Sequence, residues 1–313
     1  MKRTDTVEGK VAVVAGASRG CGRGIAVALG EAGATVFVTG RTTRSGPTPV
    51  DQAPGAIEDT AEEVTRRGGR GIPVRVDHTD PSQVEDFFAR VRQTHGRLDI
   101  LACGVWGGNE RYLDPIWNES FWKQPVGVWN EFLGAGSYAF WLSAHASSRL
   151  MAENHTGLIV AVTEPITSQF DGQQSSLAET FGHLAHYSTN RLVTALARDA
   201  QEAGIAIVGL LPGFMRTERV ELHLPDEESR KRFRYDLSES TEYCGRAVAA
   251  LASDSNVLAK SGKLLFVADL AEEYGFTDID GKRVANFYKV VSGKQEIEQE
   301  TTTSLPADSS NRS

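Results

Sequence analysis

Residues 11–32 have the sequence VAVVAGASRGCGRGIAVALGEA, in which a short apolar run, a glycine-rich turn and a helical pattern follow one another. The run at 11–15 has the β-branched composition of a strand that is buried on both faces of a sheet. The turn at 16–22 contains three glycines, and apolar residues at helical spacing begin within it. This order predicts the first strand, turn and helix of a βαβ sheet.

The alternation of short apolar runs and longer helical patterns continues along the chain. Runs that fit buried strands lie at 11–15, 35–39, 72–76, 99–103, 158–162, 205–211 and 264–267. Helical patterns lie between them, at 22–32, 57–67, 81–95, 128–152, 188–203 and 241–252. Because strands separated by helices need crossover connections, the sequence predicts an α/β, Rossmann-type, doubly wound parallel sheet of about seven strands with helices on both faces.

The 313 residues fit one domain of this type, which we expect to span 1–291 and to include the substrate pocket. The remainder, 292–313, is rich in Glu, Thr, Ser and Asn, and a polar tail of this kind is expected to be disordered. Two irregular segments, 42–55 and 165–186, follow the second and fifth strands. Such sheets bind ligands at the carboxyl ends of their strands, so both segments are predicted to border the site.

The composition limits the classes of partner. With 41 acidic and 33 basic residues the formal charge is −8, which opposes binding to nucleic acid or to an anionic membrane and leaves a small-molecule substrate. The cysteines Cys21, Cys103 and Cys244 lack metal-ligand spacing, and we expect inert thiols, a reducing compartment and no metal site. The polar start at 1–10 and the absence of a long apolar run predict a cytoplasmic protein.

The glycine turn predicts a dinucleotide site. Without a Cβ the backbone can turn sharply and approach a pyrophosphate, and the amides at the following helix N-terminus can bind the anion. The predicted contacts are Gly16, Ser18, Arg19, Gly20 and Gly22. A glycine turn can also serve a tight turn that binds nothing, but its place between a first strand and a first helix favours the binding interpretation.

Arginine at the end of the second strand points to a phosphorylated dinucleotide. An NAD-specific protein usually carries a carboxylate there for the ribose 2′-hydroxyl, whereas this chain has Arg41. The planar guanidinium groups of Arg41 and Arg19 match the oxygens of a 2′-phosphate. We therefore predict NADP(H) rather than NAD(H) as the cofactor. The alternative is that both arginines are solvated loop residues.

Three later features accompany this turn, namely Asp77 after the third strand, the i, i+4 pair Tyr187 and Arg191, and the turn Pro212-Gly213 followed by Thr217. With the glycine turn, this set resembles the short-chain dehydrogenase/reductase superfamily, over residues from about 9 to about 281 by the strand and helix pattern. Within that superfamily, the stretches 121–129 and 261–281 resemble the subgroup of dehydrogenase/reductase member 1.

The resemblance implies how the cofactor is held. Asp77 is expected to hydrogen-bond the adenine, and Thr217 with the Pro212-Gly213 turn is expected to hold the nicotinamide end. The other implied cofactor contacts are His78, Gly104, Tyr187 and Arg191. Judged by itself, Asp77 could instead cap a turn, and Pro-Gly is common in turns.

The catalytic set that the resemblance implies is altered in this chain. Family members reduce a carbonyl with a tyrosine acid, a lysine, a serine and a supporting asparagine, because hydride arriving at carbon leaves alkoxide character on oxygen. Tyr187 matches the tyrosine, and Arg191 replaces the lysine as its electrostatic partner. Glu164 falls on the serine position, with the hydroxyl of Thr163 beside it, and the asparagine is missing. The expected catalytic set is therefore Tyr187, Arg191, Glu164 and Thr163.

Other side chains near the expected site are interpreted more simply. His183 and His186, within the segment 165–186, are taken as solvated loop residues rather than as proton donors. Trp106, just after the fourth strand, is expected to line the substrate pocket.

The leading hypothesis is an NADP(H)-dependent oxidoreductase that transfers hydride between the nicotinamide and a carbonyl or alcohol substrate. The alternative is a dinucleotide-binding protein with lost or changed catalysis. It would be either a non-redox regulator or an enzyme in which Glu164 supports imine reduction, isomerase or lyase chemistry. The family usually associates through the two long helices after the fourth and fifth strands, so the resemblance implies a homodimer or homotetramer.

Overall fold

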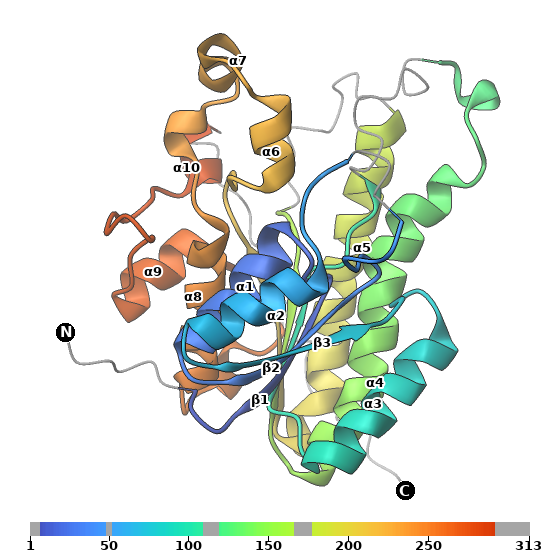
Figure 1. Cartoon of the computed structure of the whole chain (residues 1–313), viewed down its shortest axis with the longest axis vertical. Coiled ribbons are helices and arrows are strands. Elements are labelled where there is room, and N and C mark those ends of the chain that lie inside the picture. Colours follow the sequence, from blue (N-terminus) through green and yellow to red (C-terminus); the bar gives the residue numbers. More distant parts are fainter. Residues whose placement is uncertain (1–6, 48–51, 109–118, 166–176, 292–313) are drawn as a thin grey trace, which may run out of the picture.

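The computed structural model describes residues 7–47, 52–108, 119–165 and 177–291. Its strands form one parallel sheet in the order β3-β2-β1-β4-β5-β6-β7 (Figure 1). They are β1 (Val11–Ala15), β2 (Thr35–Gly40), β3 (Arg70–Arg75), β4 (Ile100–Cys103), β5 (Gly157–Val162), β6 (Ile205–Leu211) and β7 (Leu264–Phe266). The strand order reverses between β1 and β4, which is where doubly wound sheets bind ligands. The predicted fold class is confirmed.

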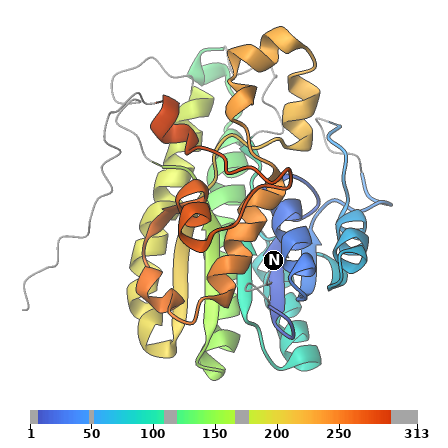
Figure 2. The same cartoon turned by 90° about the vertical axis from the view of Figure 1, so that its left-hand side faces the viewer.

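Helices cover both faces of the sheet. One layer consists of α1 (Gly20–Glu31), α2 (Ile57–Arg66) and α8 (Thr241–Ser253) (Figure 1). The other consists of α3 (Pro81–His95), α4 (Ala139–Glu153) and α5 (Leu177–Ala200). Two short helices, α6 (Glu218–His223) and α7 (Glu227–Arg232), lie beyond the carboxyl ends of the strands in both views (Figures 1 and 2). The chain then continues through α9 (Val267–Tyr274) to α10 (Phe287–Val291).

Strand residues alternate between the two layers, and β1 shows the pattern. Ala12 and Val14 belong to the core beneath α1, α2 and α8, whereas Val11, Val13 and Ala15 belong to the core on the opposite face. All five side chains are buried. Because both faces of the strand are covered, its sequence is a continuous apolar run rather than an alternating one.

Several strand and helix boundaries differ from the sequence expectation, and two of them matter for the fold. β3 begins at Arg70 rather than at 72, and it accepts Pro73 because it is an edge strand. α5 begins at Leu177 rather than at 188, so the last part of the segment expected to be irregular is helical. The side chains of Phe181 and Phe132 lie against each other in a small apolar cluster, which stabilises the first turns of α5.

The helix before β5 is also not uniform. It begins as a π-helix over Asn130–Tyr138 and continues directly into α4, where one α-helix over 128–152 was expected. In the described part of the chain, no helix is both long and apolar enough to cross a membrane. The tail expected to be disordered, 292–313, lies outside the described residues.

Candidate active site

A cavity of about 470 Å³ lies where the carboxyl ends of the central strands meet α6. Its size is within the range of small-molecule sites. Of the predicted site residues, its lining includes Gly16, Ser18, Arg19, Gly20, Arg41, Asp77, His78, Gly104, Thr163, Glu164, Pro212 and Thr217. Trp106 lines it as well. Within the described ranges, the lining does not include Gly22, Gly213, Tyr187 or Arg191.

The glycine turn needs glycine for steric reasons. Gly16 has a φ of 78°, and a Cβ there would lie 2.9 Å from backbone atoms of Gly104. A Cβ on Gly22 would lie 2.2 Å from the Gly16 carbonyl oxygen. The amides of Gly16 and Ala17 donate to the Thr39 carbonyl at 2.9 Å, which fixes the turn against β2. A tight backbone turn that is held in this way and leads into a helix N-terminus is suited to bind a pyrophosphate.

The two arginines expected near a 2′-phosphate both line the cavity but differ in their surroundings. The Arg19 guanidinium donates from Nε to the Pro54 carbonyl and from Nη2 to the Gly55 carbonyl, each at 3.0 Å. Arg41 follows the end of β2 and is exposed. Arg19 therefore holds a neighbouring loop in place while it lines the cavity, and Arg41 is the more accessible side chain for an anion.

Asp77 and His78 line the cavity without presenting a charged imidazole to it. Asp77 Oδ1 accepts hydrogen bonds from the Thr79 amide at 3.0 Å and the Thr79 hydroxyl at 2.7 Å. The buried His78 ring contacts the hydroxyls of Thr39 and Ser143, at 2.7 and 2.9 Å. Burial lowers the pKa of His78 to about 4, so this ring is neutral at physiological pH and links β2 to α4.

Two lining residues, Thr217 and Glu218, lie at the beginning of α6. The Thr217 hydroxyl accepts from the Val220 amide at 3.2 Å and caps that helix. Glu218, which the sequence did not single out, accepts from the Gly20 amide at 2.7 Å through its Oε2 atom. A carboxylate from α6 therefore binds the amide that begins α1, the position at which the glycine turn would hold a phosphate.

Tyr187 and Arg191 are exposed residues of α5 that are not part of the described cavity lining. The side chains of Ala185, Thr189 and Val193 are buried and mark the face of α5 that packs on the protein, whereas Tyr187 is 48% exposed and Arg191 is exposed. Neither side chain belongs to the lining that the described residues form, whereas His186, one position before Tyr187, does. The expectation that Tyr187 and Arg191 meet the substrate and the cofactor stays a prediction.

His186 on α5 belongs to the cavity lining, and a hydrogen-bond chain through Thr163 and the buried Asn190 fixes it. Asn190 Nδ2 donates to the Glu164 carbonyl at 3.0 Å, so its Oδ1 is the acceptor for the Thr163 hydroxyl at 2.8 Å. Having donated its only proton, Thr163 accepts from His186 Nδ1 at 3.2 Å. This network assigns the proton of the neutral imidazole to Nδ1 and leaves a lone pair on Nε2.

The free side of the His186 ring lies next to the Glu164 carboxylate. His186 Nε2 and Glu164 Oε1 are 3.8 Å apart, and the Trp106 indole stacks on the imidazole with ring centroids 4.4 Å apart. Burial lowers the pKa of His186, and the negative charge of Glu164 opposes this effect. His186 is therefore mainly neutral near pH 7, with its Nε2 lone pair beside a carboxylate in the cavity lining.

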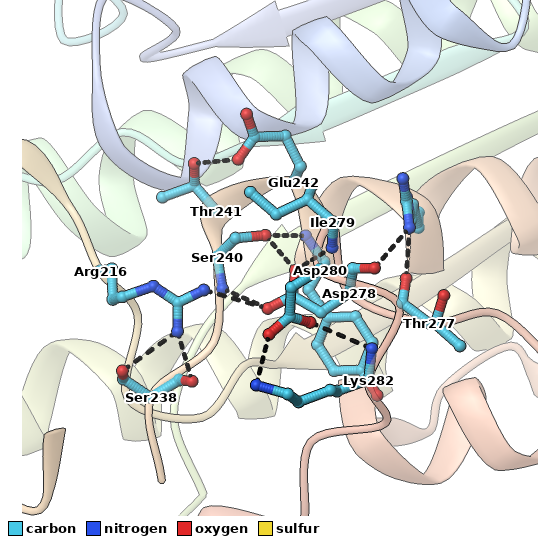
Figure 3. A network of polar contacts seen from close by, with 12 residues as sticks. Arg216, Ser238, Ser240, Thr241, Glu242, Thr277, Asp278, Ile279, Asp280 and Lys282 are labelled. Carbon is cyan, nitrogen blue, oxygen red and sulfur yellow. Dashed lines mark hydrogen bonds and ion pairs between the residues drawn. The ribbon is translucent and has the colours of Figure 1, made fainter. Parts of the chain in front are cut away.

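A polar network anchors the chain segment that follows β6 (Figure 3). Asp278, which is 1% exposed, accepts from the Ser240 amide at 2.9 Å and from Arg216 Nη2 at 3.2 Å. The Ser240 hydroxyl also donates to this carboxylate. Arg216 Nη1 donates to the Ser238 carbonyl at 2.6 Å. The C-terminal region is thus tied to the segment between β6 and α8.

Glu239 lies at the centre of this anchored segment. Its amide donates to the Phe214 carbonyl at 2.9 Å, and its carbonyl accepts from the Arg216 amide at 2.8 Å. Because Phe214 and Met215 line the cavity, these bonds fix one of its walls. A Cβ on Gly213 would lie 2.9 Å from the Oε2 atom of Glu239, so this glycine packs against the Glu239 carboxylate. Gly213 is not among the described residues that line the cavity.

A sequence signal for the orientation of α5 was available. Buried residues at 189, 193 and 197 form a stripe with helical spacing, and both His186 and Asn190 fall within it or beside it. Tyr187 and Arg191 follow these two residues by one position each. Glu218 had no such signal, because its partner Gly20 is distant in the sequence.

The strand order, the glycine turn and the cavity define a Rossmann-type dinucleotide-binding protein. The model of the family described as short chain dehydrogenase matches residues 10–228, and this chain belongs to that family of oxidoreductases. It is 36% identical to mouse dehydrogenase/reductase SDR family member 1 over 292 residues, 91% of this chain and 88% of the relative. The human protein of that name is 33% identical with the same coverage. The resemblance found in the sequence is confirmed.

More distant comparisons agree on the fold. The chain is 26% identical to the 3-oxoacyl-[acyl-carrier-protein] reductase FabG of Escherichia coli K12, over 79% of this chain and 91% of the relative. A short chain dehydrogenase structure from Mycobacterium thermoresistibile superposes with a TM-score of 0.73 at 22% identity, covering 90% and 92% of the two chains. A structure from Beutenbergia cavernae is described as an NAD(P)-dependent gluconate 5-dehydrogenase with bound NADP. It superposes with a TM-score of 0.65 at 23% identity, covering 84% of this chain and 97% of that one.

Proposed function

We propose that this chain is an NADP(H)-dependent oxidoreductase that acts on a small molecule bound beside His186, Glu164 and Trp106. One observation carries the proposal: the glycine turn, the Pro212 and Thr217 segment and the His186 and Glu164 pair line a single cavity. When bound, the nicotinamide would supply or accept the hydride. The glycine turn fits the pyrophosphate, because it is sharp and leads directly into the N-terminus of α1.

The preference for NADP(H) rests on Arg41. Its exposed guanidinium lines the cavity after β2, where it would pair with a 2′-phosphate. Arg41→Ala is expected to weaken NADPH binding about tenfold and to leave NADH binding within about twofold. Arg44→Ala is the matched control, because Arg44 is outside the lining and forms ion pairs with Asp59 and Glu62. Equal losses for both cofactors in Arg41→Ala would reject this assignment.

His186 is the proposed acid/base group. Its Nε2 lone pair faces the cavity, so it can take a proton from a bound substrate or return one, and Thr163 and Asn190 act as positioning residues through Nδ1. In the mechanism expected from the sequence Tyr187 is the acid. The presence of His186 in the described cavity lining, which does not include Tyr187, supports His186 in this role.

The two assignments are separated by substitution. Under the proposal, His186→Gln lowers kcat by about 100-fold without a matching loss of NADPH affinity, and Tyr187→Phe leaves turnover unchanged. The readout is nicotinamide absorbance with a panel of carbonyls, alcohols and imines, together with a binding titration. Loss of turnover in Tyr187→Phe with an active His186→Gln would reverse the assignment. Tight dinucleotide binding by the wild-type chain without turnover of any substrate would favour a non-redox dinucleotide-binding role.

Self-association through α4 and α5 is a further part of the proposal. Tyr138 and Trp141 lie one turn apart where the π-helix meets α4, and Leu184 and Tyr187 lie one turn apart on α5; all four are exposed. We expect a dimer or tetramer in solution, and Trp141→Glu is expected to lower the mass measured by light scattering. Leu258→Glu, at an exposed position away from these helices, serves as the control.

A further inference from the structure

We infer that the substrate of this site is a nitrogen cation, an iminium ion that is reduced to an amine or the amine that is oxidised to it. This inference rests on the proposed nicotinamide-dependent activity and names its substrate class. The geometry behind it is the pair of hydrogen-bond acceptors, His186 Nε2 and Glu164 Oε1, that stand 3.8 Å apart in the cavity lining.

Thr163 and Asn190 hold this pair in place through hydrogen bonds. The Asn190 amide donates to the Glu164 carbonyl, and the Thr163 hydroxyl donates to Asn190. His186 Nδ1 then donates to Thr163, so the imidazole presents only a lone pair on its other side. Among the described residues, this pair therefore offers two acceptors to a ligand that can bring the hydrogens itself.

Reduction of a neutral carbonyl fits such a site poorly. Hydride addition to C=O places negative charge on oxygen, and that oxygen needs a proton or hydrogen-bond donors directed at it. Here the oxygen would meet a carboxylate and a lone pair. The repulsion would raise the barrier instead of lowering it, because like charges at this distance in a partly buried site interact strongly.

The same two acceptors attract an iminium ion, because it carries a positive charge. Its carbon gains the hydride from NADPH, the C=N π pair becomes the nitrogen lone pair, and the products are a neutral amine and NADP⁺. The hydride step itself takes no proton from the protein. In the reverse direction, His186 Nε2 can accept the proton that the ammonium form must lose before the amine gives up hydride. Glu164 stabilises the cation, and an N–H of the substrate can donate to either acceptor.

The remaining walls suit an organic cation. Glu164 keeps 55% of its side-chain surface accessible, so its charge reaches the cavity. Phe214 and Phe233 add aromatic faces to the lining, and aromatic faces attract cations. The arginines Arg19 and Arg41 belong to the glycine turn and the end of β2, where the phosphates of the cofactor are expected.

The test compares a cyclic imine with a ketone of the same shape. With NADPH, 2-methyl-1-pyrroline is expected to give a kcat/KM at least about tenfold above that of 2-methylcyclopentanone. Glu164→Gln is expected to lower imine turnover by about tenfold or more while leaving the NADPH affinity unchanged. Glu164→Asp, which keeps the charge, should retain part of the activity. Glu179→Gln, on α5 and outside the described lining, is the control for removal of one acidic charge.

A binding measurement supplies a readout that does not depend on turnover. The ammonium form of 2-methylpyrrolidine, the product amine, is expected to bind the wild-type chain at least about tenfold more tightly than Glu164→Gln by calorimetry. Two results would overturn the assignment of a nitrogen cation as substrate and leave the oxidoreductase proposal intact. One is turnover of ketones or alcohols without turnover of imines, and the other is equal binding of the amine by the wild type and Glu164→Gln. Failure of NADPH to bind would instead overturn the proposed function.

Discussion

The Glu218 carboxylate accepts a hydrogen bond from the Gly20 amide, with its Oε2 atom 2.7 Å from the nitrogen. Gly20 is the first residue of α1, and its N–H points out of the helix as an unsatisfied donor would. The carboxylate thus uses the same donor that a bound pyrophosphate would use. A phosphate and a carboxylate cannot share it, because their negative charges repel each other, so Glu218 must move when a dinucleotide binds.

Glu218→Gln is therefore expected to bind NADPH about three- to tenfold more tightly than the wild-type chain. The substitution removes the charge that competes for the glycine turn, and anions at a helix N-terminus contribute free energies of this order. A fluorescence titration with NADPH measures the change. Glu227→Gln on the neighbouring α7 removes an exposed charge that does not line the described cavity, and it should leave the affinity unchanged. Weaker binding by Glu218→Gln would show that the carboxylate helps to hold the cofactor.

The Asp278 network predicts a large effect on stability. Asp278→Ala leaves the Ser240 amide without its acceptor and removes the partner of a mostly buried Arg216, at an expected cost of about 2–4 kcal/mol in the free energy of unfolding. Urea denaturation measures this cost. Asp280→Ala is a matched control, since Asp280 is exposed and bonds only with nearby Lys282 (Figure 3). Its expected cost is below about 0.5 kcal/mol. Similar costs for both variants would contradict an anchoring role for Asp278.

Much of the fold could be predicted because its signals are local. The apolar run of β1, the glycines at 16 and 22 and the helix that follows lie within one short stretch, and each is required by backbone geometry. The cavity residues at strand ends followed from the same logic, since parallel strands bring their carboxyl ends to one edge. Residues such as Thr163 and Pro212 therefore fell within the lining.

The parts that could not be predicted depend on orientation and on distant contacts. Tyr187 and His186 are neighbours in the chain, and only the packing of α5 decides which of them faces the cavity. The spacing of a motif does not determine that rotation. The contacts of Glu218 with Gly20 and of Asp278 with Ser240 join segments far apart in the sequence. The residues around one partner do not indicate which residue the other partner is.

Glu239 predicts a dependence of stability on pH. Its side chain is 1% exposed, its Oε1 atom has no hydrogen-bond partner among the described residues, and burial raises its pKa from 4.5 to about 8. Asp278 raises this pKa further, whereas the Gly213 amide and Arg216 act against the rise. The folded state therefore holds a proton that the unfolded chain releases above about pH 4.5. Protonated Glu239 therefore stabilises the folded state fully below about pH 4.5, and this contribution is lost as the pH rises through about 8.

The comparison of wild type with Glu239→Gln isolates this contribution. Between pH 5 and pH 8 the wild-type free energy of unfolding should fall, relative to the variant, by roughly 1 kcal/mol per pH unit. Urea denaturation at several pH values measures the difference, and other titrating groups cancel because both chains share them. Glu228→Gln, at an exposed site on α7, should follow the wild type. Parallel pH profiles for wild type and Glu239→Gln would show that Glu239 is ionised in the folded state.

The Cys21 and Cys244 thiols predict a specific response to oxidation, in place of the inert thiols expected from the sequence. Their sulfur atoms are 3.1 Å apart, joining α1 to α8, and both are free thiols. A disulfide bond needs an approach of only about 1 Å more. Hydrogen peroxide can take two electrons and two protons from the pair, leaving one disulfide and two water molecules. Mass spectrometry of peptides digested without reductant should recover the Cys21–Cys244 link.

The rate of this oxidation reports on the cavity. Cys21 lines the cavity, so NADPH binding should slow its loss, whereas Cys103 is buried with a pKa raised to about 11 and should remain a thiol. The pKa of Cys244 is also raised, by its contact with Cys21 and by burial, so attack should start at Cys21. Cys103→Ser should oxidise like the wild type, and Cys21→Ser should form no intramolecular link. A link that forms equally fast with and without NADPH would show that Cys21 is reached from outside the cofactor site.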